Sequence, residues 1–225
     1  MKGIPTITAN VLQQISTFEC LKDYTLIGGT ALALQINHRV SEDIDFCKWK
    51  TTKSEINRVN TLPIENELKN IGVYKRNYLE DNHVDYYLND VKITFFCNNW
   101  YKKPAKLHTI PFLNNIKLAD INDIGITKLE VLFDRKMFRD YYDFYSIIKA
   151  GGDFNRIVDD FLQYTNHNYR SRDTLAMLAN GKRHYYETNI EHLLPKHQVS
   201  IYEISEFLQP YIENYRNLQK KVLNI

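Results

Sequence analysis

Two stretches decide the fold of this chain: Leu26-Ile27-Gly28-Gly29 and Asp43-Ile44-Asp45-Phe46, separated by thirteen residues. The first predicts a strand that ends in two glycines, and a helical pattern follows it. On the strand expected for the second, alternate side chains point to opposite faces, so the two aspartates share one face. Adjacent carboxylates repel each other unless a cation or a proton lies between them. The pair therefore predicts a site for a hard divalent ion that arrives with a nucleoside triphosphate, Mg²⁺ or alternatively Mn²⁺.

The glycines predict a phosphate site beside these carboxylates. Gly28 and Gly29 allow a phosphate to approach the backbone, and the free N–H groups of the following helix attract anions. Thr30 can cap that helix and offers a hydroxyl. Alone, such a Gly-Gly pair is usually only a turn, and a lone Asp-x-Asp is usually an exposed edge strand. Together they favour a metal site at Asp43 and Asp45.

Composition describes an ordinary folded protein of 225 residues, with 44% hydrophobic and 25% charged residues. A net charge of +2 is too small to argue for nucleic-acid binding by itself. No apolar run reaches transmembrane length, so we expect no membrane partner. Cys20, Cys47 and Cys97 have no metal-ligand spacing, which favours reduced thiols in a cytoplasmic protein.

Periodicity divides the chain into two parts. Strands and helices mix as far as residue 118, including a helix over 53–71 and a hairpin of strands 84–88 and 91–96 around Asn89-Asp90. Later segments are helical, with helices expected over 123–150, 154–165, 171–180, 184–192 and 201–223. The pattern predicts an α+β protein with an α/β domain at 1–118 and a helical bundle at 119–225.

A second set of charges lies in the predicted helix 123–150. Lys128, Arg135 and Arg139 are seven and four residues apart, which predicts one shared helix face. Asp143 is placed to pair with Arg139. The alternative is an ordinary solvated face. Opposite an acidic metal pair, we favour phosphate binding for Lys128 and Arg139 and a bracing role for Arg135, Asp140 and Asp143.

The finer pattern resembles a known family. Gly28-Gly29-Thr30-Ala31-Leu32, then His38-Arg39, Ser41 and Asp43-Ile44-Asp45-Phe46, is similar to the AbiEii/AbiGii toxin-type nucleotidyltransferases of the DNA polymerase beta-like superfamily. Lys128, Arg135 and the string Arg139–Tyr145 resemble the downstream motif of that family. The two blocks span about residues 26 to 149, and the last third matches only as a helical region.

This resemblance implies a polymerase beta-like nucleotidyltransferase domain, with a short mixed sheet flanked by helices, in front of a helical bundle. It implies a nucleoside triphosphate as substrate, two-metal chemistry, and release of pyrophosphate. Gly28, Gly29 and Ser41 would face the phosphates, and Arg39 could reach them or be a surface arginine. The acceptor implied is RNA, particularly a tRNA end, or a protein, and an antitoxin commonly restrains such a toxin.

One position departs from the superfamily. Relatives often carry a third carboxylate on a later strand, where this chain has Thr94 within Val91-Lys92-Ile93-Thr94-Phe95. If Asn89-Asp90 is a two-residue turn, Asp85 lies across from Thr94 on the same sheet face. Asp85 then either supplies the third carboxylate, or is an exposed strand residue and the second metal site is weakened.

Two other functions therefore stay open. A chain without the third carboxylate would be a nucleotide-binding module that transfers nothing. A nucleic-acid-binding regulator is the third alternative, and the small net charge argues against it. Tyr185-Tyr186 and Lys182-Arg183 could contact a nucleic acid by stacking and charge, or could be ordinary packing and surface residues.

Overall fold

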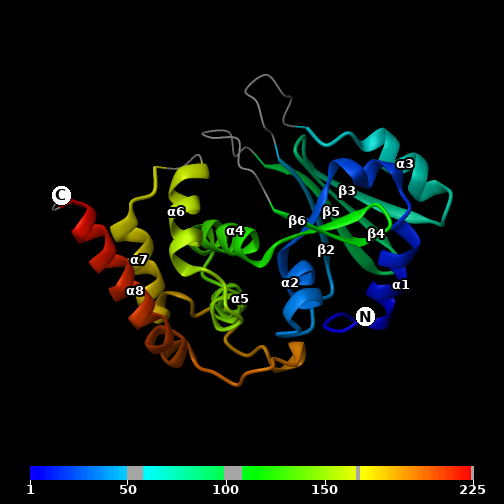
Figure 1. The fold of residues 1–225 in the computed structure, drawn as a ribbon. Helices are drawn as coiled ribbons and strands as arrows, with labels where there is room; N and C mark the ends of the chain where they lie inside the picture. Colours follow the sequence, from blue (N-terminus) through cyan, green and yellow to red (C-terminus); the bar gives the residue numbers. More distant parts are fainter. Residues whose placement is uncertain (50–57, 99–107, 166–167, 224–225) are drawn as a thin grey trace.

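A seven-stranded mixed sheet forms one lobe of the protein, and helices form the other (Figure 1). The computed structural model describes residues 1–49, 58–98, 108–165 and 168–223. The strands lie in the order β3-β4-β5-β2-β1-β7-β6. Their bounds are β1 Thr25–Ile27, β2 Ile44–Trp49, β3 Tyr74–Glu80, β4 His83–Leu88, β5 Val91–Asn98, β6 Thr109–Leu113 and β7 Ile116–Ala119.

Helices cover both faces of the sheet (Figure 1). On one side lie α1 and α3, and on the other α2 and then α4, behind which the remaining helices pack. The bounds are α1 Thr6–Ile15, α2 Gly28–Ile36, α3 Thr61–Lys69, α4 Ile121–Asp134, α5 Phe138–Lys149, α6 Phe154–Tyr164, α7 Ser171–Ala179 and α8 Ile201–Leu223. The α+β architecture expected from the sequence is thus confirmed.

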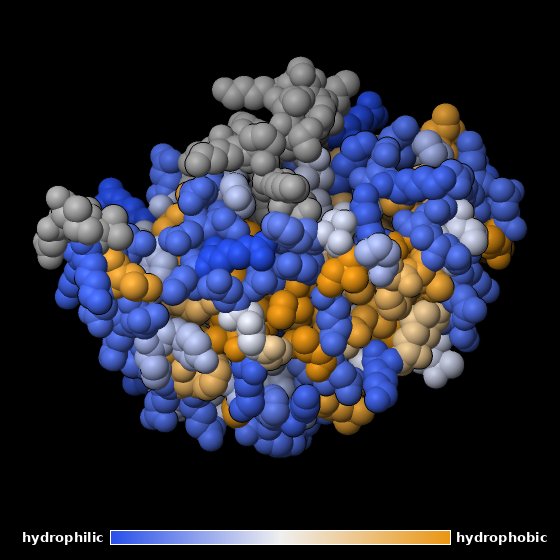
Figure 2. Space-filling view, viewed as in Figure 1, coloured by the Kyte–Doolittle hydropathy of each residue, from blue (hydrophilic) through white to orange (hydrophobic). Residues whose placement is uncertain are grey.

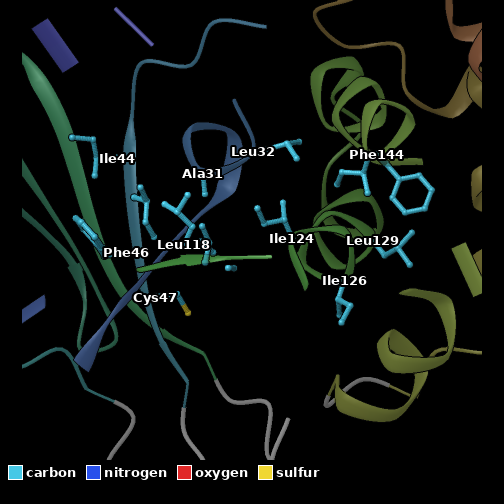
Figure 3. Close-up of a cluster of buried hydrophobic side chains, with 14 of the residues drawn as sticks. Ala31, Leu32, Ile44, Phe46, Cys47, Leu118, Ile124, Ile126, Leu129 and Phe144 are labelled. Atoms are coloured by element: carbon cyan, nitrogen blue, oxygen red, sulfur yellow. The ribbon is translucent and has the colours of Figure 1, made fainter. Parts of the chain in front are cut away.

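The core has one layer on each side of the sheet. Phe46 stacks on Phe95 at 5.3 Å between ring centroids, and Tyr86 packs edge-on against Phe95 on the side of α3. On the opposite side, Figure 3 shows Leu118 of the sheet facing Ile124 of α4. In Figure 2, hydrophobic residues gather over the middle of the molecule between α4 and the sheet, whereas α8 presents a mostly hydrophilic surface.

The strand pairing places Asp45 and the later strand as the sequence predicts, whereas Asp43, expected to begin the strand, directly precedes β2. β5 lies between β2, its parallel neighbour, and β4, its antiparallel neighbour. Asn89 and Asp90 have φ of 50° and 62°, so they form a two-residue hairpin turn with both residues left-handed. Because this turn fixes the register, Asp85 pairs with Thr94, and Thr94 pairs in turn with Asp45.

Several predicted elements differ from the structure. The helix expected over 123–150 is two helices, since Arg135 has φ −132° and ends α4. The helix expected over 53–71 is described only as α3, with 50–57 outside the described residues. The helix expected over 184–192 is absent from that described segment, where short 3₁₀ turns occur instead. Strand β7, which the sequence did not predict, extends the sheet to Ala119, and the domain boundary at 118/119 stays a prediction.

Candidate active site

The two glycines make room for charged side chains at the start of α2. Gly28 has φ +71°, and a Cβ there would lie 2.7 Å from Asp45 Oδ2. A Cβ on Gly29 would lie 2.7 Å from Arg39 Nη2 and 2.8 Å from Ser41 Oγ. Register explains the first contact, because Ile27 pairs with Asp45 across β1 and β2. The glycine and aspartate stretches therefore meet in space, with the Asp45 carboxylate against the start of a helix.

Asp43 and Asp45 lie in one electrostatic group with Lys92 of β5. The Lys92 Nζ is 3.1 Å from Asp43 Oδ2, and the Asp43 side chain is 49% exposed. Burial raises the pKa of the Asp45 carboxyl, Lys92 opposes the rise, and the neighbouring Asp43 adds to it. Two ionised carboxylates this close, one of them buried, are more stable when a cation lies beside them. In this structure the cation is the Lys92 ammonium.

Asp85 is buried beside this pair. It is 7% exposed, and it accepts a hydrogen bond of 2.8 Å from the Thr94 hydroxyl. His83 Nε2 lies 3.4 Å from the same carboxylate. The expectation that Asp85 is an exposed strand residue is therefore wrong, because the hairpin directs it toward Thr94. The role of Asp85 as the third carboxylate stays a prediction.

The donor set fits one divalent ion held in part by a substrate. Within the described residues, no three His, Cys, Asp or Glu side chains converge as a metal site. Mg²⁺ in proteins commonly takes one or two carboxylates and completes its shell with phosphate oxygens and water. Asp43 and Asp45 satisfy that pattern.

The hydroxyl side chains of the glycine loop are used internally. Thr30 is fully buried; its hydroxyl donates to the Asp43 carbonyl and lies 3.1 Å from the Ser41 hydroxyl. Ser41 is 7% exposed. The expected contacts of Thr30 and Ser41 with phosphate are therefore not supported, because both groups tie the loop before β2 to α2.

Arg39 and Lys128 belong to a buried ion network centred on Asp143. Arg39 donates to both Asp143 oxygens at 2.7 and 2.9 Å, and Lys128 Nζ lies 2.6 Å from Asp143 Oδ2. Lys128 also pairs with Asp140 at 2.8 Å, and His38 Nε2 lies 2.8 Å from Asp143. Burial alone would raise the pKa of Asp143, but Arg39, Lys128 and His38 hold it well below its usual range.

This network corrects the expected shared helix face. Lys128 lies on α4 and Arg139 on α5, and Asp143 pairs with Arg39 and Lys128 rather than with Arg139. Lys128 is 6% exposed and held by two carboxylates, which argues against direct phosphate binding. Arg39 is likewise an internal partner of Asp143 and not a surface arginine. The bracing role expected for Asp140 and Asp143 agrees with these contacts, and Arg135 braces Asp140 at 2.8 Å.

The loop that carries Arg39 is also held by the C-terminal part of the chain. The Val40 N–H donates to the Leu193 carbonyl, and the Lys196 N–H donates to the His38 carbonyl, both at 2.7 Å. The Tyr142 hydroxyl donates to the same His38 carbonyl at 3.1 Å. On the other side, the Ser41 N–H donates to the Gly3 carbonyl at 3.0 Å, so loop 38–41 is held by both the N-terminal and the C-terminal parts of the chain.

A model of the family described as "Nucleotidyl transferase AbiEii toxin, Type IV TA system" matches residues 10–221. The chain belongs to this AbiEii family. It is 24% identical over 155 residues to an uncharacterized protein of Aquifex aeolicus (strain VF5), covering 68% of this chain and 70% of that protein. It is also similar to the crystal structure of JHP933 from Helicobacter pylori, with a TM-score of 0.54, 16% identity, and coverage of 97% and 93% of the two chains. At that identity the structural likeness shows the fold alone.

For this AbiEii protein, the family predicted from the sequence is confirmed, and with it a nucleotidyltransferase at the level of the family. No helix in the part of the chain that the structure describes has the length and apolar character to span a membrane. The site roles given to single residues stay predictions.

The sequence reasoning missed Lys92 and His38 in this AbiEii site. Lys92 could have been found by alternation, because it stands two residues before Thr94 and so on the carboxylate face. His38 stands in the motif that carries the resemblance, but the sequence assigned it no role. Its buried Nδ1 has no hydrogen-bond partner among the described residues, and burial lowers the pKa of the ring against the opposing effect of Asp143.

Proposed function

We propose that this protein transfers a nucleoside monophosphate from a nucleoside triphosphate to a hydroxyl group of an acceptor and releases pyrophosphate. The observation that carries the proposal is the Asp45 carboxylate lying against Gly28 at the start of α2, in one electrostatic group with Asp43. A metal-binding pair next to uncapped helix N–H groups is what a triphosphate with its ion requires.

The start of α2 suits the phosphates. Ile27, the residue before the helix, makes no side-chain hydrogen bond to its first N–H groups. Those donors are left for an anion, and the positive end of the helix dipole adds to their attraction. The Arg39 guanidinium, which Asp143 holds in place, lies next to Gly29 and adds a fixed positive charge beside the glycine turn.

Asp43 and Asp45 would hold the metal, Mg²⁺ or alternatively Mn²⁺. When bound, the ion would neutralise phosphate charge and stabilise the leaving pyrophosphate. The Lys92 ammonium competes for Asp43 and must share it. Asp85 would accept the proton of the acceptor hydroxyl. It pairs in register with Thr94, which pairs with Asp45, and the Thr94 hydroxyl donates a hydrogen bond to it.

We further propose RNA, particularly a tRNA end, as acceptor, with a protein hydroxyl as the alternative. The family description as the toxin of a type IV toxin–antitoxin system supports an antitoxin counterpart. A role in phage defence by abortive infection is part of the same proposal and follows from the resemblance alone. A cytoplasmic location agrees with Cys20, Cys47 and Cys97 all being free thiols.

The test is incorporation of labelled nucleoside monophosphates into total RNA in the presence of Mg²⁺. We expect Asp45→Asn to lower incorporation about 100-fold or more, as the loss of charge stabilisation at a reacting phosphate does. Glu42→Gln is the matched control, since it removes a neighbouring exposed carboxylate and should keep full activity. Equal activity of Asp45→Asn and wild type would reject the proposal.

A second function, a nucleotide-binding module without transfer, is favoured by one observation. Thr94 stands where a metal-binding carboxylate would pair with Asp45, and Lys92 occupies Asp43. Tight binding of a triphosphate with Mg²⁺, without label transfer to RNA or protein, would support this second function. Loss of transfer in Asp85→Asn with unchanged triphosphate binding would support the enzyme.

A further inference from the structure

Two adjacent tyrosines remain at the surface of the helical lobe. Tyr185 and Tyr186 are 51% and 52% exposed, and their ring centroids lie 4.4 Å apart with 34° between the planes. A tyrosine in a core buries roughly 150–250 Å², so leaving two rings half in water gives up substantial apolar burial. The pair therefore has no explanation in core packing.

The backbone holds this pair in place. The Tyr186 N–H donates to the Lys136 carbonyl at 3.2 Å, and the Phe138 N–H donates to the Tyr186 carbonyl at 2.9 Å. The next residue, Glu187, has φ +50°, a left-handed conformation uncommon for residues other than glycine. These bonds tie the backbone at Tyr186 to the linker between α4 and α5.

A lysine lies beside the rings. Lys136 Nζ lies 6.0 Å from the centre of the Tyr185 ring. The Arg135 side chain is 49% exposed, and half-buried Arg139 forms no ion pair with a described residue. The nearby acidic side chains in the sequence are Asp134, Asp140 and Glu187, and Asp140 pairs with Arg135. The positive charge beside the rings is therefore that of Lys136.

This surface adjoins the buried ion network centred on Asp143. Arg135 pairs with Asp140 at 2.8 Å, and Asp140 pairs with Lys128 at 2.8 Å. Lys128 also pairs with Asp143 at 2.6 Å. The segment that holds the tyrosine pair is therefore next in the chain to a residue of the buried ion network, because Tyr186 bonds to the backbone of Lys136 and Arg135 precedes Lys136.

We infer that Tyr185, Tyr186 and Lys136 form a platform for unpaired bases of a single-stranded polynucleotide, with the rings stacking on bases and the lysine contacting a phosphate. The inference rests on the proposed function, since it places the acceptor strand of the transfer. Aromatic rings beside cations bind single strands of any sequence, because every base has a face that can stack.

Arg183 does not belong to this platform. Its Nη2 donates to the Phe133 carbonyl at 3.3 Å, and its guanidinium lies over the Phe133 ring. Lys182 lies over Tyr202 instead. Of the four residues that the sequence grouped as a nucleic-acid contact, the two tyrosines are the pair whose exposed rings lie against each other.

The experiment measures binding of a fluorescent single-stranded RNA of about 10 nucleotides, within the usual site sizes of roughly 4–16. We expect Tyr185→Ala with Tyr186→Ala to weaken binding about tenfold or more, and the corresponding double Phe variant to bind like wild type. Phe112→Ala, which removes another exposed aromatic ring on β6, is the matched control. Lys136→Ala should reduce the slope of log affinity against log salt by about 0.7.

Two comparisons decide the occupant. A single-stranded DNA of the same sequence should bind through the same tyrosines, and the duplex should bind at least about tenfold more weakly, because its bases cannot stack on the rings. Equal RNA binding by the double Ala variant and wild type would overturn the inference. So would a wild-type protein that binds no single strand and instead transfers the label to a protein. Triphosphate binding, measured separately on the same variants, tests the proposed function alone and should not change.

Discussion

Asp143→Asn should destabilise the whole protein, because Asp143 is the anion that two buried cations share. The side chain is fully buried and contacts Arg39 through two hydrogen bonds, Lys128 at 2.6 Å and His38 at 2.8 Å. An asparagine has nearly the same shape but no charge, so Arg39 keeps no anionic partner among these contacts. Removing one member of a buried ion pair typically costs about 3–5 kcal/mol.

For a chain of this length, that loss corresponds to a fall in Tm of about 6–20 °C. Urea unfolding followed by far-UV circular dichroism measures the loss in the free energy of unfolding, with Asp173→Asn as the control. Asp173 pairs with Arg172 at 3.6 Å on the surface, and such exposed pairs contribute about 1 kcal/mol or less. Adding Arg39→Met to Asp143→Asn should recover part of the loss, because the double variant no longer buries an unpaired guanidinium.

The pH dependence gives a second measure of the same charge. The folded pKa of Asp143 lies well below its ordinary value, so its contribution to stability is present above about pH 4 and is lost as the pH falls through the folded pKa. The stability difference between wild type and Asp143→Asn should therefore shrink in acid. A variant within about 1 kcal/mol of wild type at neutral pH would refute the reasoning that this network holds the lobes together.

Three other perturbations address separate features. Gly28→Ala should abolish transfer of the label, because the added Cβ would displace the Asp45 carboxylate. Gly151→Ala is the control: its backbone has a similarly positive φ of +94°, but no atom lies within 4 Å of the added Cβ, so activity should be kept. Burial lowers the pKa of His184 to about 4, so the free energy of unfolding of wild type should fall by up to about 3 kcal/mol as the pH falls from 6.5 to 4. His184→Phe should remove this fall. Equal urea midpoints of wild type at the two pH values would contradict the prediction. Lys92→Met should lower the Mg²⁺ concentration needed for triphosphate binding about two- to fivefold, and an unchanged Mg²⁺ titration would show that the lysine does not compete with the ion.

Local sequence rules predicted the sheet part of the site well. The Asn89-Asp90 turn and strand alternation placed Asp85 opposite Thr94, because a two-residue hairpin leaves one register. The same alternation set Asp45 on the carboxylate face. These predictions succeeded because they depend on backbone geometry within a few residues.

The helical part of the site could not be predicted in the same way. Nothing in the sequence marks the end of α4, since Arg135, Lys136 and Met137 are all acceptable in a helix interior. Lys128 of α4 and Arg135 at the C-terminal end of α4 both pair with Asp140 of α5, so ion pairs between the two helices accompany the break. Such an arrangement depends on tertiary contacts, so the spacing of Lys128 and Arg139 predicted a shared face that does not exist.

The two backbone hydrogen bonds between loop 38–41 and residues 193–196 have a consequence for the order in which a working enzyme can arise. A ribosome finishes the glycine turn and both aspartates early, but Val40 and His38 find their partners at Leu193 and Lys196 only after about 150 more residues have been added. Contacts this distant in sequence form late in folding. A growing chain therefore has loop 38–41 without these two bonds until residues 193–196 have been made, and a product truncated before them lacks the bonds altogether. The loop beside the glycine turn is thus completed by a segment that the ribosome makes much later.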